Sequence, residues 1–219
     1  GIRLKSDETD LLDGVTPSTE GVAAAIAPDE PVTLIIHGEN ESQDANRTEV
    51  GIIDALVDAL ENPSNDDTGI VTPHNAQKGR LTQRFGDIAT IDTVERFQGG
   101  EREVMMISAT ASDPDYVRSE AEFLLDPNRL NVAMSRMKKK LVIVASKSVF
   151  QVTPPDAEEF DQTLIWKRLY DALGITADSP TTTAWKGDIS AFMPESVDLP
   201  DSDQDYEMEI YSLSAQTEE

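Results

Sequence analysis

Short apolar runs recur along the middle of this chain and alternate with polar turns and with segments of helical spacing. The runs are rich in Val, Ile and Met, and they occupy residues 32–36, 68–72, 88–93, 104–109 and 141–145. Such runs are typical of strands that are buried on both faces. Because they alternate with helical segments, the sequence predicts an α/β fold with a parallel sheet and helices on both faces.

Helical spacing is clearest over residues 46–60, where the apolar positions are Val50, Ile53, Leu56, Val57 and Leu60. This spacing places the apolar side chains on one face of a helix. The turn-forming residues 62–67 end the helix. Two further helices are predicted over residues 126–138 and 162–173.

Composition divides the chain into three parts. Residues 1–30 are rich in Asp, Glu, Thr and Ser, and we interpret them as a linker or the end of a preceding region. Residues 31–175 hold the predicted strands and helices and form the main domain. After residue 176 the chain contains 11 acidic residues and one lysine, which predicts a disordered acidic tail over 176–219.

The net charge of −24 is distributed unevenly. Residues 78–140 carry 11 basic and 10 acidic residues, whereas the remainder carries 7 basic and 32 acidic residues. Acidic residues are therefore concentrated toward the two ends of the sequence. The middle is close to neutral and keeps clusters of basic residues that could bind phosphates. High surface acidity with only 8 lysines favours a protein adapted to molar salt.

Cysteine usage and hydropathy exclude several classes of protein. The chain has no cysteine, which excludes disulfides, zinc fingers and thiol nucleophiles. No apolar run reaches the roughly 18 residues that a membrane span requires, so no membrane partner is expected. No secretory leader opens the sequence, and we expect a cytoplasmic protein.

Three polar segments follow or precede the predicted strands in a fixed order. They are residues 72–77 (TPHNAQ), 93–103 (TVERFQGGERE) and 126–136 (DPNRLNVAMSR). Ligands of parallel sheets gather at the carboxyl ends of the strands, and we expect these segments to meet there.

The residue types in these segments suit a phosphorylated ligand. The glycines after Gln98 allow the backbone to turn sharply and to approach a ligand closely. Glu101 projects from this turn and can accept hydrogen bonds from a sugar hydroxyl. An arginine such as Arg136, placed beside the ligand edge of the sheet, can bind a γ-phosphate through two hydrogen bonds and stabilise charge during phosphoryl transfer.

The ordered set resembles motifs IV, V and VI of superfamily 1 helicases, in the branch that includes the nonsense-mediated-decay RNA helicase and the Okazaki-processing nuclease-helicase. The family pattern V-[DE]-x-F-Q-G-x-E-x-[DE] matches residues 94–103, and D-P-x-R-L-N-V-A-[LM]-[ST]-R matches residues 126–136. Residues 46–49 (NRTE) are similar to an N-x-x-E element upstream of motif IV. The resemblance covers residues 31–150 and implies a three-layer RecA-like (P-loop NTPase-type) domain, flanked by acidic extensions.

The resemblance implies roles for the matching positions. Arg136 would be the catalytic arginine that contacts the γ-phosphate. The residues expected near the nucleotide are Gln98, Gly99, Gly100, Glu101 and Arg129. The residues expected to approach single-stranded DNA or RNA are Thr72, Pro73, His74 and Thr93. Gln77 and Arg80 begin the helix after motif IV, where the family sometimes places nucleotide contacts.

A Walker A motif, G-x-x-x-x-G-K-[ST], does not occur in the sequence. In the family this motif lies on the first RecA-like motor domain, together with the ligands of the Mg²⁺ that accompanies ATP. The chain would therefore be half of a motor, present as a fragment, a split-gene product or a remnant, and inactive as an ATPase alone. The alternative is a truncated helicase paralogue that serves as a nucleic-acid- or protein-binding module.

Several candidates also have plain structural interpretations. Arg129 could hold motif VI against the sheet without meeting a ligand. Thr72 and Thr93 end strands, where threonines commonly cap the next helix. The lysine run at 138–140 is more typical of a solvated edge than of a phosphate site.

Overall fold

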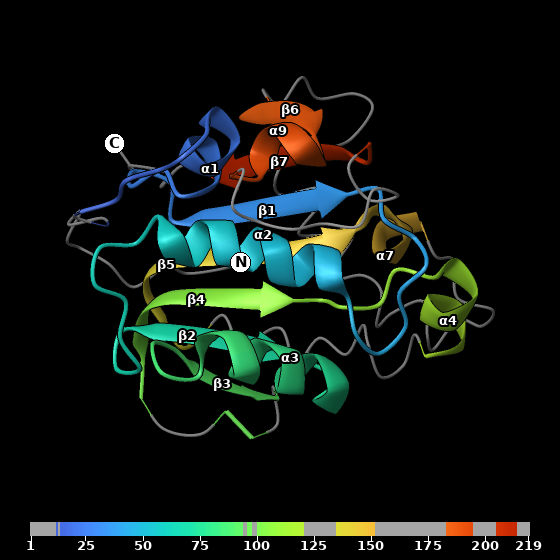
Figure 1. The fold of residues 1–219 in the computed structure, drawn as a ribbon, viewed down its shortest axis with the longest axis horizontal. Helices are drawn as coiled ribbons and strands as arrows, with labels where there is room; N and C mark the ends of the chain where they lie inside the picture. Colours follow the sequence, from blue (N-terminus) through green and yellow to red (C-terminus); the bar gives the residue numbers. More distant parts are fainter. Residues whose placement is uncertain are drawn as a thin grey trace, which may run out of the picture.

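Seven strands form one sheet in the computed structural model, which describes residues 12, 14–93, 96–97, 100–120, 135–151, 183–194 and 205–213. The strands are β1 (Val32–His37), β2 (Thr68–Thr72), β3 (Thr90–Thr93), β4 (Arg102–Ser108), β5 (Met137–Ser146), β6 (Trp185–Asp188) and β7 (Glu207–Leu213). Their spatial order is β3-β2-β4-β5-β1-β7-β6 (Figure 1).

Most of the sheet is parallel. The neighbours from β3 across to β1 pair in parallel, whereas β7 is antiparallel to β1 and β6 is antiparallel to β7. The five strands predicted from the apolar runs are the five parallel ones, and the predicted α/β fold class is confirmed. The structure adds an antiparallel pair at one edge.

Helices and buried clusters cover the sheet on both faces. The described helices are α1 (Glu20–Ala25), α2 (Arg47–Asp58), α3 (Asn75–Phe85), α4 (Pro114–Ser119), α7 (Lys147–Gln151) and α9 (Ile189–Phe192). One buried cluster joins Ile35 and Val142 of the strands to Leu56 of α2. A second cluster joins Ile143 to Val149 of α7. Figure 1 shows α2 and α3 lying across the same face of the sheet.

The predicted helix over 46–60 is present as α2, and its first turn is capped. The Oδ1 of Asn46 accepts a hydrogen bond from the N–H of Glu49 at 2.9 Å, which satisfies one of the free amides at a helix N-terminus. The predicted helix over 162–173 lies outside the described residues. The predicted helix over 126–138 lies outside them up to residue 134, and its last two positions belong to β5, which begins at Met137.

The described part of the acidic tail is ordered, which differs from the prediction of a disordered segment. β7 pairs with β1 along the whole length of β1, from Val32↔Leu213 to His37↔Met208. Met208 and Ile210 are fully buried. These apolar residues alternate with acidic ones, so one face of β7 enters the core while the average composition stays acidic.

The N-terminal segment also packs onto the domain, although the sequence suggested a linker. The hydroxyl of Thr19 caps α1 and donates to the carbonyl of Phe192 in α9 at 2.8 Å. The Nζ of Lys140 donates to the carbonyls of Ala27 and Glu30 at 3.1 and 2.5 Å. These contacts join the turn before β1 to the start of β5.

Candidate functional site

The predicted site residues separate onto two opposite edges of the sheet. Thr72 and Thr93 pair with each other at the carboxyl ends of β2 and β3. Gly100 and Glu101 instead directly precede β4, and Arg136 directly precedes β5. The expectation that all three motifs meet at the carboxyl ends is therefore wrong, because the connection between two parallel strands must return to the amino end of the next one.

The amino edge brings the glycine bend and Arg136 together. The N–H of Arg102 donates to the carbonyl of Arg136 at 2.8 Å, which joins the starts of β4 and β5. Gly100 has φ of +83°, a conformation that glycine adopts at little cost. Glu101 is exposed beside it. Gly100 and Arg136 thus lie close to each other at the amino edge of the sheet.

Arg102 supports this rim. Its guanidinium lies 5.8 Å from the centre of the Phe97 ring and donates to the hydroxyl of Thr90 at 3.3 Å. Phe97 is buried in the core. The bend is therefore attached to the sheet by a cation–aromatic contact as well as by the backbone.

Arg136 is half-buried, and within the described residues no carboxylate pairs with it. Its Nε is buried and has no hydrogen-bond partner among the described residues, nor does any carboxylate of that part of the chain form an ion pair with it. A buried donor without a partner is costly, so such a group is a candidate for binding a ligand. Gln98, Gly99 and Arg129 lie outside the described residues.

The carboxyl edge holds the predicted nucleic-acid residues in mixed environments. Thr72 is fully buried, and its hydroxyl lies 2.8 Å from that of Thr110. Pro73 is half-buried. His74 is largely buried, with its ring 5.9 Å from that of Tyr116. Thr93 is buried as well. Pro73 is thus the most accessible of the four, and the Thr72 hydroxyl is engaged inside the protein.

Cations of α3 lie close to this edge. The Nζ of Lys78 lies 2.6 Å from the Oδ1 of Asp92, and Arg80 is exposed on the same helix. Burial alone would raise the pKa of Asp92, but hydrogen bonds from Lys78 and from the N–H of Thr93 outweigh it and lower that pKa. Asp92 therefore stays ionised and fixes Lys78 beside Thr93.

A buried polar network at the carboxyl edge was not predicted as a site. Glu49, in the N-x-x-E element, is fully buried and accepts hydrogen bonds from the N–H of Thr110 at 2.9 Å and from the hydroxyl of Ser108. Gln77, which the resemblance placed near a nucleotide, is also fully buried. Its amide bonds to the backbone of Asn46 and to Ser108. Gln77 is thus engaged inside the protein.

Glu39 is the second buried carboxylate of this network. Its oxygens accept hydrogen bonds from the hydroxyls of Ser42 and Ser112 at 3.1 and 2.6 Å and from the amide of Asn46 at 2.7 Å. The N–H of Glu41 completes the set at 2.7 Å. No sequence pattern singled out Glu39, because a carboxylate in a polar loop is usually solvated.

Residues 25–148 match the protein family described as the AAA domain, which is more than half of the chain. The chain belongs to this family. Its relatives identify the branch as superfamily 1 helicases of the nonsense-decay and Okazaki type, which confirms the resemblance seen in the motifs. The chain therefore carries a helicase domain.

Several curated proteins are similar to this helicase domain. It is 32% identical over 112 residues to the DNA replication ATP-dependent helicase/nuclease of Arabidopsis thaliana, covering 50% of this chain and 8% of the relative. It is 33% identical over 113 residues to the DNA polymerase alpha-associated DNA helicase A of Saccharomyces cerevisiae, covering 48% and 16%. It is 29% identical over 140 residues to a regulator of nonsense transcripts 1 homolog of Drosophila melanogaster, covering 56% and 12%. The matched region is thus a small part of each relative.

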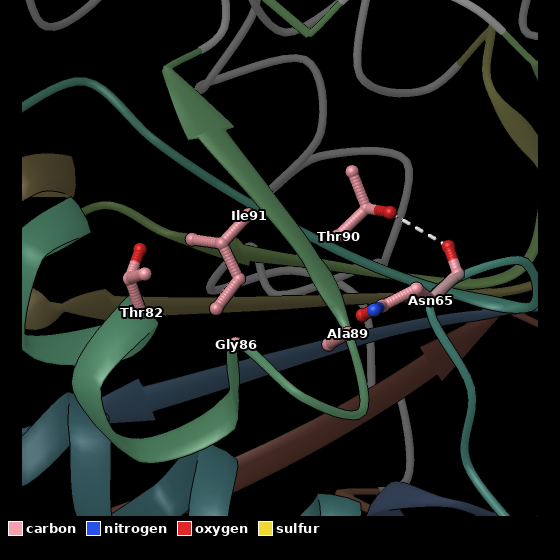
Figure 2. A pocket seen from close by; sticks show the side chains of 6 residues that line it. All are labelled: Asn65, Thr82, Gly86, Ala89, Thr90 and Ile91. Atoms are coloured by element: carbon pink, nitrogen blue, oxygen red, sulfur yellow. Dashed lines mark hydrogen bonds between the residues drawn. The ribbon is translucent and has the colours of Figure 1, made fainter.

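The helicase domain also has a shallow hollow at its amino edge (Figure 2). It is lined by Asn65, Thr82, Gly86, Ala89, Thr90 and Ile91. The carbonyl of Asn65 accepts a hydrogen bond from the hydroxyl of Thr90 at 2.6 Å. The hollow brings together no group of charged side chains and contains none of the predicted site residues. Among the described helices of the domain, none is long and apolar enough to cross a membrane.

Proposed function

We propose that this chain is the second motor domain of an ATP-dependent DNA or RNA helicase. In this role it supplies an arginine finger and nucleic-acid contacts to an ATP site that a first RecA-like domain, carrying Walker A, completes. The names of the relatives support ATP-dependent helicase activity. The absence of Walker A from the sequence supports the need for the partner domain.

The buried Nε of Arg136, which has no hydrogen-bond partner among the described residues, is the observation that carries this proposal. A chain with 42 acidic residues offers many partners for an arginine, yet within the described residues Arg136 has no carboxylate partner. It lies at an edge beside a glycine bend, next to the start of β4. An arginine held in this way can stabilise the negative charge that develops on a transferred phosphoryl group.

The residues at the amino edge fit a nucleotide. The buried, unpaired Nε of Arg136 supplies a donor for phosphate oxygens, and the positive φ of Gly100 lets the backbone approach a ligand. Glu101 would accept from a ribose hydroxyl, with Gln98, Gly99 and Arg129 as further predicted contacts. Bound ATP with Mg²⁺ would supply the phosphoryl group, and we expect the Mg²⁺ ligands on the first motor domain.

Single-stranded DNA or RNA is the proposed ligand of the carboxyl edge. Pro73 and His74 form the turn between β2 and α3, and the exposed Arg80 follows on the helix. A basic side chain there would neutralise phosphate, whereas backbone groups of the turn would contact the strand without regard to its sequence. Thr72 and Thr93 would support this surface.

The test is to combine the chain with the Walker A domain of the same helicase, in trans or as a fusion, and to measure ATPase activity stimulated by single-stranded nucleic acid. We expect Arg136→Ala to lower turnover by about 10³-fold while nucleotide binding changes little, because the arginine acts mainly on the transition state. Wild-type turnover by this variant would overturn the arginine assignment.

A matched control is Arg118→Ala. Arg118 is exposed and pairs with Asp115 in α4, so its removal deletes the same positive charge away from the amino edge. We expect its turnover to stay near wild type. Failure of the combined domains to hydrolyse ATP at all would contradict the motor role and favour a binding module.

A further inference from the structure

Glu49 joins three segments that are distant in sequence. Its Oε1 lies 3.3 Å from the Nε2 of His37 at the end of β1, and its Oε2 accepts from Ser108 at the end of β4. The same Oε2 accepts from the N–H of Thr110 at 2.9 Å. The side chains of Glu49 and His37 are fully buried. A carboxylate with this many donors is held firmly in one position.

Thr110 has a backbone conformation that requires such support. Its φ of +71° lies in the left-handed region, which a β-branched residue rarely adopts and which stores strain. Glu49 holds its N–H, and the amide of Asn46 donates to its carbonyl at 3.1 Å. Both groups belong to the N-x-x-E element, so the first turn of α2 fixes this residue on two sides.

Thr110 in turn contacts the turn that we propose for nucleic acid. Its hydroxyl lies 2.8 Å from that of Thr72, the residue before Pro73. On the other side of the turn, Gln77 donates to the hydroxyl of Ser108 at 3.0 Å. Glu49 binds both Ser108 and Thr110. The turn at 73–74 is therefore attached at both ends to groups that Glu49 holds.

We propose that Glu49 is a positioning residue for nucleic-acid binding. Its carboxylate holds Thr110 in the left-handed conformation, and Thr110 fixes Thr72 so that Pro73 and His74 are presented at the carboxyl edge. The role rests on the proposed function for its ligand, but the contact between Glu49 and Thr110 can be tested without any ligand.

The experiment uses the full chain and two readouts. One is amide hydrogen exchange at Thr110, resolved by NMR. The other is the affinity for a fluorescent single-stranded oligonucleotide over a range of salt. We expect Glu49→Ala to lower protection of the Thr110 amide by about 10–100-fold, because its charged acceptor is lost. We expect affinity to fall by at least about tenfold, since the turn is released.

Two further variants separate positioning from general stability. Glu49→Gln keeps an oxygen that can accept a hydrogen bond from the N–H of Thr110, and its NH₂ group can face the Nε2 of His37. The imidazole of His37 can then carry its proton on Nδ1, which is buried without a hydrogen-bond partner in the described residues. We expect it to retain most of the affinity. Asp54→Asn removes a charge from the same helix, where Asp54 pairs with Arg84 away from the network, and should leave the Thr110 amide protected.

Each outcome decides a separate claim. Wild-type protection and affinity in Glu49→Ala would overturn the positioning role. Equal loss of affinity in Glu49→Ala and Asp54→Asn, at matched unfolding free energies, would also overturn it. If the unchanged chain binds no oligonucleotide, the proposed nucleic-acid contact fails, and the exchange measurement alone decides whether Glu49 holds Thr110.

Discussion

Three consecutive lysines at the start of β5 have three different environments. Lys138 is exposed, and Lys139 pairs with Glu103 at 3.2 Å. Lys140 is fully buried, and its ammonium donates to the two carbonyls of the turn after α1. Lys138 and Lys140 lie on the same face of the strand, yet one is exposed and the other buried. A run of like charges therefore need not be a solvated edge.

Lys140 makes the stability of the fold depend on pH. Burial lowers its pKa from 10.5 to about 8, although the carboxylates of Glu30 and Asp29 oppose the shift. Between these values the unfolded chain keeps the proton that the folded chain releases, so stability rises with pH. We compare the unfolding free energy of the unchanged chain with that of Lys140→Met. From pH 7 to pH 10 we expect the value for the unchanged chain to rise by up to about 3 kcal/mol relative to the variant.

Urea unfolding of both proteins at intervals across this range measures the effect. Other titrating groups contribute equally to the two proteins, so only the difference between the curves is used. Parallel curves would show that the Lys140 proton is not linked to folding. Well below pH 8 the difference should be constant, because Lys140 is protonated in both the folded and the unfolded state there.

The candidate site residues differ in how far the sequence predicted the surroundings of each side chain. Arg136 and Gly100 lie at the starts of two neighbouring strands, which a hydrogen bond between Arg102 and Arg136 joins. Thr72 and Gln77 are instead occupied within the buried network, since hydrogen bonds between distant segments leave no local signal. Residue type and spacing indicate what a side chain can do, but only tertiary contacts determine whether it is available.

The elements differ in how well the sequence predicts them. The parallel strands were predicted because burial on both faces requires uninterrupted apolar residues. β7 was missed because acidic residues interrupt its buried positions, as Glu207 and Glu209 alternate with Met208 and Ile210. β6 was missed as well. The sequence also did not predict that motif V begins at the carboxyl edge, after β3, and ends at the amino edge, before β4. Residues 94–101 have no periodic pattern that would indicate this.

The ordered tail can be tested with two substitutions in β7. Ile210→Ala removes a fully buried side chain from the core, and we expect it to lower the unfolding free energy by about 2–5 kcal/mol. Glu207→Ala, in the same strand but exposed and paired with Lys186, should cost less than about 1 kcal/mol. Urea unfolding measures both. Equal, small effects would indicate that β7 does not contribute to the core.

At the scale of the whole molecule, the two proposed binding edges lie at opposite ends of the same strands. β4 begins beside Arg136 and ends at Ser108, which Glu49 and Gln77 contact. Its seven residues span about 20 Å. In the proposed motor, a nucleotide at the amino edge and a nucleic acid at the carboxyl edge are therefore connected through strands that are packed on both faces and that resist deformation.

The charge of the whole chain leads to a prediction about salt. A net charge of −24 produces self-repulsion in the folded state, and the Debye length falls from about 10 Å at 0.1 M to about 3 Å at 1 M salt. We expect KCl to stabilise the chain, with each kcal/mol gained raising Tm by about 2–4 °C. The measurement is thermal unfolding from 0.1 to 2 M KCl, with sorbitol of equal osmolality as the control. Because sorbitol does not screen charge, a larger rise in KCl identifies repulsion as the cause, and equal rises would contradict it.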